Sequence, residues 1–225
     1  MGSVPPLIAF VCQANVCRSR LAAAFFKRGL REAGLEGAAR VATAGTHALP
    51  DRGCCEWALA NVDQDDRRAM LADDPTPVTA QLLDDASLCL GLDREVHAAL
   101  IRLSPPARPK IFTLKEAAAL AQLAIADNSS RGQNTDFDWR GGSERDLAWL
   151  VVEMDAARGW LPVQPDGPRR FRRSLTWSKS LDVPDAHDDT RRAVRHQITL
   201  AELQPAVVSL AASVASALRV ADQQV

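Results

Sequence analysis

The sequence predicts an α/β fold in which a small parallel sheet of about four strands is flanked by helices. Four short apolar runs carry this prediction, and each is followed by a helix-like segment. Parallel strands are buried on both faces and need long crossover connections, so their sequences are continuously apolar. The four runs have this character. They cover about residues 7–11, 40–43, 87–92 and 110–114.

Helical patterns follow the strands along the chain. Gly34 is expected to cap the first helix, because glycine accepts the left-handed backbone that ends many helices. Pro205 is expected to divide or kink the last one. Residues 1–225 should form a single domain with an insertion at about 127–180. The helices are expected at about 20–33, 52–60, 93–103, 115–126 and 143–158, and from about residue 190 toward the C-terminus.

The composition is that of a soluble globular protein, with 47% hydrophobic and 24% charged residues among 225. A net charge of -1 gives no overall attraction to nucleic acid or to an anionic membrane. We expect no membrane span, because no apolar run approaches the roughly 20 residues required. The five cysteines are irregularly spaced and odd in number, so reduced thiols and a cytoplasmic location are expected. The sequence has no heptad repeat of the kind that forms coiled coils, and it leaves the oligomeric state open.

The loop after the first strand carries the strongest chemical signal, with residues 12–19 reading Cys-Gln-Ala-Asn-Val-Cys-Arg-Ser. A strand-to-helix turn of this length directs backbone N–H groups toward one point, where a tetrahedral oxyanion fits. Cys12 would lie at the base of that nest, where amides and a nearby arginine favour a thiolate. The planar guanidinium of Arg18 can pair two phosphate oxygens. The pattern therefore predicts a cysteine nucleophile in an anion-binding loop.

Other loop residues have expected supporting roles. Asn15 tolerates a left-handed backbone, and the Ser19 hydroxyl can stabilise the departing thiolate. The competing interpretation makes Cys12 a small buried hydrophobic residue. A zinc site fits poorly because no second Cys or His pair has finger-like spacing, so no metal and no other cofactor is expected. The substrate-binding residues are expected to be Gln13, Ala14, Asn15, Val16, Cys17 and Ser19.

These motifs resemble the low-molecular-weight protein-tyrosine-phosphatase family, whose loop reads Cys-x-Gly-Asn-x-Cys-Arg-Ser. The segment VATAGT, residues 41–46, is similar to the family's second strand, with Thr43 expected to support Asn15. The segment SLCLGLDREVHAAL is similar to its third strand and following helix. The resemblance covers about 7–126 and 182–219. It implies a Rossmann-like three-layer fold and, under oxidation, a disulfide between Cys12 and Cys17.

The resemblance also implies a late aspartate that protonates the leaving group, and Asp185 lies where that acid would be. An ordinary acidic turn with a helix N-cap is the alternative interpretation of residues 182–189. The family's two tyrosines after the acid are absent here, so His187 is expected to contact substrate in place of an aromatic ring. Ala14 replaces the loop glycine of the family.

The sequence therefore predicts a phosphomonoester hydrolase that works through a cysteinyl-phosphate intermediate, as in a protein-tyrosine phosphatase. Its substrate would be a phosphorylated protein or a small phosphomonoester, and nucleic acid is the weaker interpretation. One alternative is an arsenate reductase, for which only Cys89 lies near the position of a resolving cysteine. The other is a phosphate- or phosphoprotein-binding module with weakened catalysis. Four arginines are expected to line the active-site mouth, namely Arg169, Arg170, Arg172 and Arg173.

Overall fold

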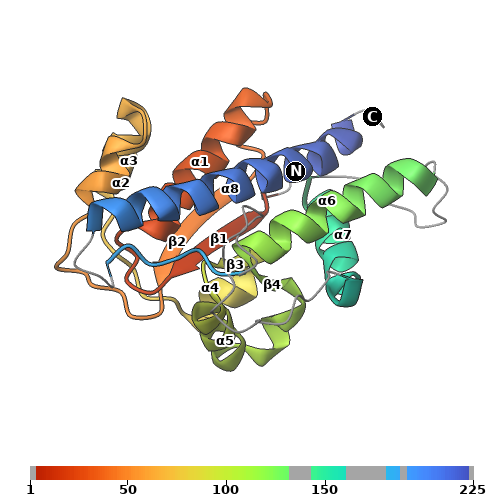
Figure 1. Cartoon of the computed structure of the whole chain (residues 1–225). Coiled ribbons are helices and arrows are strands. Elements are labelled where there is room, and N and C mark those ends of the chain that lie inside the picture. Colours follow the sequence, from red (N-terminus) through yellow and green to blue (C-terminus); the bar gives the residue numbers. More distant parts are fainter. Residues whose placement is uncertain (1–3, 132–142, 161–180, 188–191, 223–225) are drawn as a thin grey trace, which may run out of the picture.

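A four-stranded parallel sheet forms the centre of the fold (Figure 1). The computed structural model describes residues 4–131, 143–160, 181–187 and 192–222. The predicted α/β class is confirmed, and each predicted strand lies within two residues of an observed one. The strands are β1 (Leu7–Cys12), β2 (Arg40–Gly45), β3 (Leu88–Gly91) and β4 (Ile111–Thr113).

The strand order β2-β1-β3-β4 creates a switch point in the sheet. The chain leaves β1 toward β2 on one side and then crosses over to β3 on the other side. Connections that diverge in this way open a crevice at the carboxyl ends of the two central strands, which is where ligands bind in open α/β sheets. Cys12 is the last residue of β1 and lies at this crevice.

Helices cover both faces of the sheet (Figure 1). One face of the sheet packs against α1, α6 and α8, and α7 packs against α6 and α8. The other face packs against α4 and α5. The short helices α2 and α3 lie beside α1. The bounds are α1 (Arg18–Glu32), α2 (Glu56–Ala60), α3 (Gln64–Ala72), α4 (Ala80–Asp85), α5 (Arg94–Leu103), α6 (Leu114–Arg131), α7 (Ser143–Ala156), α8 (Arg192–Asp222), and the 3-10 turns η1 (Pro105–Lys110) and η2 (Arg158–Trp160).

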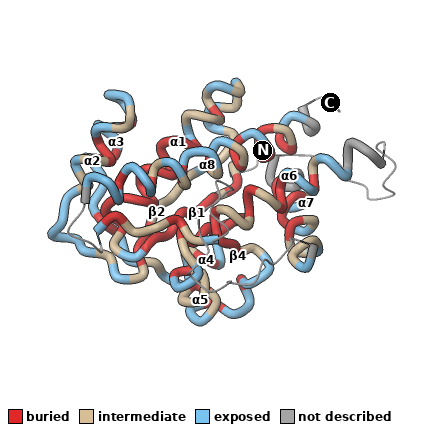
Figure 2. The backbone as a smooth tube through the Cα atoms, viewed as in Figure 1, coloured by how far each residue is buried: buried red, intermediate tan, exposed pale blue. Residues whose placement is uncertain are grey.

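Alternation along β1 divides the apolar core into two layers. Ile8 and Phe10 point to the α1, α6 and α8 side, where Phe10 meets Phe26 with ring centroids 5.5 Å apart. Ala9 and Val11 point to the α4 and α5 side. Successive side chains of a strand face opposite ways, so one apolar run supplies both layers. Figure 2 shows the strands and the inner faces of the helices as the buried part of the chain.

The ends of the helices follow local chemistry. Gly34 has a φ of 74°, its N–H bonds the Arg31 carbonyl at 2.9 Å, and the Leu35 N–H bonds the Leu30 carbonyl at 2.9 Å. These are the two bonds of a Schellman motif, and they confirm the expected cap at the end of α1. Pro205 lies within α8 and does not divide it.

Two helices, α3 and α4, were not predicted. Asp63 caps α3 by accepting a hydrogen bond from the Asp66 N–H at 2.8 Å, and Thr79 caps α4 by accepting from the Leu82 N–H at 3.1 Å. The caps are visible in the sequence, but nine and six residues are too few to display a helical period against charged neighbours.

The expectation that no apolar run approaches the length of a membrane span is wrong for α8. Among the described residues, one helical stretch, Ala193–Arg219, is long and apolar enough to cross a membrane by length and composition. Its residues Leu203, Val207, Leu210 and Val214 are fully buried in the core that α8 shares with α1 and α6. Burial in this core accounts for the apolar character of the helix.

The expected insertion at about 127–180 contains α7. The residues Leu147, Leu150 and Met154 of this helix are fully buried in the same core as α1, so α7 belongs to the main body of the fold. The helix α6 extends to Arg131, five residues beyond its predicted end at about residue 126. The four arginines of the predicted mouth segment, residues 169–173, lie outside the described residues.

Candidate active site

Cys12 lies at the floor of the loop that joins β1 to α1. Its side chain is 2% exposed, and its Sγ lies 3.1 Å from the Ser19 hydroxyl and accepts the Asn15 N–H at 3.2 Å. The Asn15 amide donates to Ser19 Oγ at 2.9 Å, which leaves the Ser19 hydrogen to be donated to the sulfur. Both contacts therefore supply hydrogen-bond donors to the Cys12 sulfur.

The carbonyl groups of the loop are hydrogen-bonded on its outer side. A peptide unit is planar with its N–H opposite its C=O, so a carbonyl held outward turns the next N–H inward. The inner side of the loop is consequently lined by N–H groups, as an oxyanion requires. The outer donors are the N–H of Thr46 to Cys12 O (3.0 Å), of His47 to Gln13 O (2.8 Å), of Leu49 to Ala14 O (3.3 Å) and of Cys55 to Val16 O (2.9 Å).

Asn15 has the left-handed backbone that its position suggested, with a φ of 56°. It is the single non-glycine residue with positive φ among the described ones, so Ala14 is accommodated without that conformation. The Asn15 side chain donates to Ser19 and accepts from the Thr76 N–H at 2.8 Å. Thr43, the expected support of Asn15, lies on β2 opposite Phe10 and lines a separate pocket.

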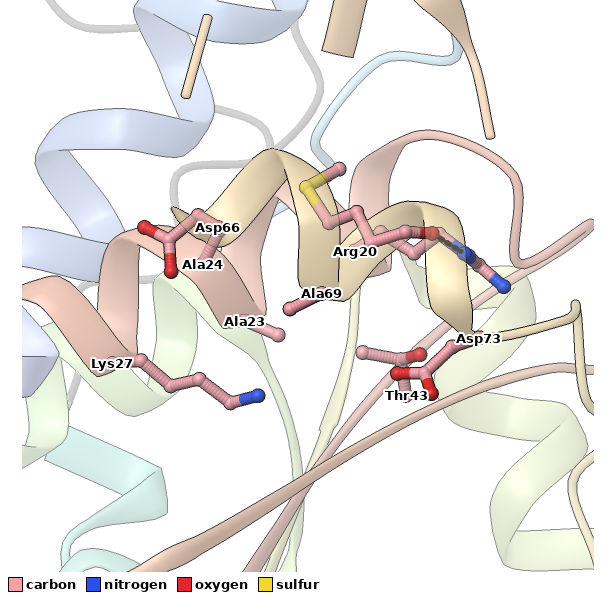
Figure 3. Close-up of a pocket in the computed structure, with 9 residues that line it drawn as sticks. Arg20, Ala23, Ala24, Lys27, Thr43, Asp66, Ala69 and Asp73 are labelled. Carbon is pink, nitrogen blue, oxygen red and sulfur yellow. Dashed lines mark hydrogen bonds between the residues drawn. The ribbon is translucent and has the colours of Figure 1, made fainter. Parts of the chain in front are cut away.

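Arg20 lies in the first turn of α1, two residues after Arg18, and it is 3% exposed. Its Nε donates to the Asn15 carbonyl at 2.7 Å and its NH1 to the Met70 carbonyl at 2.6 Å. Figure 3 shows Arg20 and Asp73 on one side of a small pocket and Lys27 on the other. Arg20 thus binds the carbonyl that the left-handed Asn15 turns outward, and it ties the loop to α3.

Gly45 allows the end of β2 to approach the loop closely. A Cβ at this position would lie 2.6 Å from the Gln13 carbonyl oxygen and 2.9 Å from the Asn15 nitrogen. Both are backbone atoms, which cannot move aside as a side chain can. The glycine in VATAGT is therefore required by the shape of the anion-binding loop.

Arg18 begins α1 and is 4% exposed. Its NH1 donates to Asp93 Oδ2 at 2.8 Å and to the Val183 carbonyl at 3.0 Å, and its NH2 pairs with Asp185. Burial by itself would lower the pKa of this guanidinium, but the charges of Cys12, Asp185 and Asp93 raise it above its usual value. Arg18 is therefore charged and is held beside the loop.

Asp185 is brought to the mouth of the loop by a short segment, residues 182–187, which we call the acid loop. The Val183 N–H donates to the Leu92 carbonyl at 2.8 Å, and the Thr199 hydroxyl of α8 donates to the Pro184 carbonyl at 2.9 Å. Asp182 pairs with Arg94 at 3.0 Å. These contacts fix the acid loop over the carboxyl end of β3, where Asp185 lies beside Arg18.

Two pockets flank the mouth, and Gln13 and Asp185 border both. One, of about 450 Å³, is charged and is lined among others by Arg18, Asp93 and Asp182. The other, of about 350 Å³, is more apolar. It is lined by Gln13, Ala14, Val16, His47, Leu49, Arg52, Asp185 and His187.

Cys17 belongs to a second group of polar side chains. The ligand atoms of Cys17, Cys55, His187 and His196 all lie within 4.8 Å of one another. Of the two expected residues in this group, Cys17 is buried while His187 is exposed and borders the apolar pocket. All five cysteines are free thiols in the structure.

Comparison with known proteins identifies the family. The model of the low molecular weight phosphotyrosine protein phosphatases matches residues 7–138, which is more than half of the chain. The chain belongs to this family. The expected resemblance is thus confirmed, and the matched region contains β1 to β4, the anion-binding loop and Arg18.

Named relatives of this phosphatase family include two kinds of enzyme. A protein-arginine-phosphatase of Bacillus subtilis is 31% identical over 109 residues, covering 48% of this chain and 70% of that protein. The low molecular weight protein-tyrosine phosphatase A of Mycobacterium tuberculosis is 36% identical over 106 residues, covering 44% and 60%. A solution structure of a low molecular weight protein tyrosine phosphatase from B. subtilis has a TM-score of 0.43 at 27% identity, covering 68% of this chain and 95% of that one.

Sequence reasoning missed Asp93, which orients the phosphatase arginine. Asp93 also caps α5 by accepting the Val96 N–H at 2.7 Å. An aspartate directly after a buried strand was a usable signal, but a helix cap was enough to explain it. Thr76, Cys55 and His196 were missed because their neighbours lie far away in the sequence.

Proposed function

We propose that this protein hydrolyses phosphorylated side chains of proteins through a phosphocysteine at Cys12. One observation carries the proposal: the sulfur, the buried Arg18 and the Asp185 carboxylate converge on a loop whose N–H groups face inward. Phosphoryl transfer needs a nucleophile, a positive field around the equatorial oxygens and an acid for the leaving group. The three groups supply these roles.

In the first step the Cys12 thiolate attacks phosphorus, the bond to the leaving oxygen breaks, and Asp185 gives that oxygen its proton. Arg18 is paired with Asp185 and Asp93 in the structure, and an incoming phosphate dianion competes for the same guanidinium. Re-pairing of Arg18 with phosphate releases the Asp185 carboxylate, which takes up a proton from solvent and can then act as the acid. A planar fork can hold Asp93 and phosphate at the same time.

In the second step Asp185, now a carboxylate, takes a proton from water. The resulting hydroxide attacks phosphorus, and the bond to sulfur breaks to release inorganic phosphate and the Cys12 thiolate. The Ser19 hydroxyl lies 3.1 Å from the sulfur and stabilises the thiolate as it leaves. Both steps therefore use the same residues, and Asp185 donates a proton in the first step and accepts one in the second.

The apolar pocket supports phosphotyrosine as a substrate. Ala14, Val16 and Leu49 offer an apolar wall beside the loop, and His187 closes one end. A flat aryl ring gains from burial against such a wall. His187 would contact the substrate ring at the position where the family commonly has tyrosine.

Phosphoarginine is a second candidate, because the other pocket is acidic. Asp93, Glu95, Asp182 and Asp185 line it together with two arginines, and a substrate guanidinium could exchange with these arginines for the carboxylates. A relative named protein-arginine-phosphatase gives further support. Arsenate reduction is not favoured, since Cys89 is fully buried in β3.

We place the enzyme in the cytoplasm, because free thiols at Cys12 and Cys17 suit a reducing compartment. This location also gives access to phosphorylated proteins.

Steady-state hydrolysis of an aryl phosphate, a phosphotyrosine peptide and a phosphoarginine peptide tests the proposal. Cys12→Ser should abolish turnover of all three, whereas Cys54→Ser, the same exchange at a half-buried thiol beside the loop, should leave it unchanged. Loss of the apolar wall in Leu49→Asp should raise KM for the phosphotyrosine peptide more than for the phosphoarginine peptide. Full activity of Cys12→Ser would refute the mechanism.

A further inference from the structure

Four side chains beside the active-site loop carry the donor atoms of a zinc site. Cys17 precedes α1, Cys55 precedes α2, His187 lies in the acid loop and His196 lies in α8. Their ligand atoms all lie within 4.8 Å of one another. The Cys55 Sγ is 3.4 Å from His196 Nε2, and the two imidazole rings meet edge to face with centroids 4.9 Å apart.

The distances fit a tetrahedral metal ion with little rearrangement. Zinc binds thiolate sulfur at about 2.3 Å and imidazole nitrogen at about 2.0–2.1 Å. A regular tetrahedron with these bonds places its ligand atoms roughly 3.3–3.8 Å apart. The observed upper limit of 4.8 Å therefore requires a contraction of about 1.5 Å or less. Two thiolates and two imidazoles form the closed donor set of structural zinc sites.

The surroundings hold the ligands in place. Cys17 and His196 are buried, and Cys55 is half-buried beside them. The Trp57 ring packs on His196 with centroids 4.6 Å apart and fixes the orientation of that imidazole.

We propose that Cys17, Cys55, His187 and His196 bind one Zn²⁺ ion that fastens the acid loop to the anion-binding loop. Sequence spacing could not suggest this site, because its ligands come from four separate segments and none forms a finger-like pair. A disulfide between Cys17 and Cys55 is the competing use of the two thiols, and it would not explain why His187 and His196 lie beside them.

The position of the site gives the metal a function. Cys17 directly precedes Arg18, and His187 follows Asp185 by two residues. A metal that joins Cys17 to His187 sets the distance between the phosphate-binding arginine and the acid, and it keeps Cys17 from pairing with Cys12. This effect on catalysis rests on the proposed function, whereas metal binding does not.

Metal content of the full-length chain tests the site directly. The protein is stripped with a chelator under reductant, titrated with Zn²⁺ alone, and separately with Co²⁺. We expect about one tightly bound zinc ion per chain and the intense visible absorption of tetrahedral cobalt with thiolate ligands. Cys12→Ser should bind equally, which separates this site from zinc held by the nucleophile. Cys12→Ser also separates the two proposals, because it should lose hydrolysis and keep the metal.

Variants locate the ion. Cys55→Ser and His196→Gln should weaken zinc binding by roughly 100-fold or more, since each removes one of four ligands. The neighbouring Cys54→Ser should bind like the wild type, because Cys54 Sγ donates instead to the Val16 carbonyl. Circular dichroism confirms that each variant is folded. A wild-type chain that retains no zinc, a six-coordinate cobalt spectrum, or equal loss in Cys54→Ser would overturn the proposal.

Discussion

Substitution of Gly45 tests how closely the shape of the anion-binding loop controls catalysis. In Gly45→Ala the new Cβ would lie 2.6 Å from the Gln13 oxygen, whereas ordinary contacts begin at 3.4 Å. The loop must therefore move by about 0.8 Å, which is the difference between these distances. A misplacement near 1 Å costs about 100-fold in rate, and overpacking of this kind costs about 1–3 kcal/mol of stability.

The assay for this variant is kcat for an aryl phosphate, with the free energy of unfolding measured by denaturant titration. We expect kcat to fall by about 100-fold while most molecules stay folded. Gly53→Ala is the matched control, because no atom lies within 4 Å of its added Cβ, and it should change neither quantity. A Gly45→Ala enzyme with wild-type kcat would refute the claim that the loop needs this glycine.

Two further substitutions test the residues that hold the loop and its arginine. Arg20→Met removes the hydrogen bonds to the Asn15 and Met70 carbonyls, so the free energy of unfolding should fall by about 2–4 kcal/mol in thermal denaturation. An unchanged unfolding midpoint would contradict the role of Arg20. Asp93→Asn keeps the α5 cap but weakens the hold on Arg18, so kcat/KM should fall about 10-fold at nearly constant stability. If Asp93→Asn lost stability as well as activity, Asp93 would have a structural role and not the role of orienting Arg18.

The strands and the nucleophile loop were predictable because their signals are local. Each strand is a continuous apolar run, and Asn15 is one of the few residue types that accepts the backbone of its position. The loop chemistry also depends on adjacent residues, from Cys12 to Ser19. Asp185 was placed through the resemblance, since its spacing alone is equally that of a helix cap.

Long-range contacts explain what the sequence did not reveal. A charged residue in the first turn of a helix is usually exposed, yet Arg20 is buried because α3 supplies a carbonyl for it. The helix α3 was missed, so its effect on Arg20 could not be foreseen. Cys55 and His196 are 141 residues apart, and they meet where His196 of α8 packs on Trp57 of α2.

Trapping of the covalent intermediate tests the central claim most directly. The Asp185→Asn variant is mixed with an aryl phosphate whose leaving group needs no acid, quenched within one turnover and digested for mass spectrometry. The mechanism predicts one phosphoryl group on the peptide that contains Cys12, and none in Cys12→Ser. Release of the aryl alcohol with no phosphoryl group on Cys12, or with the group on another residue, would contradict it.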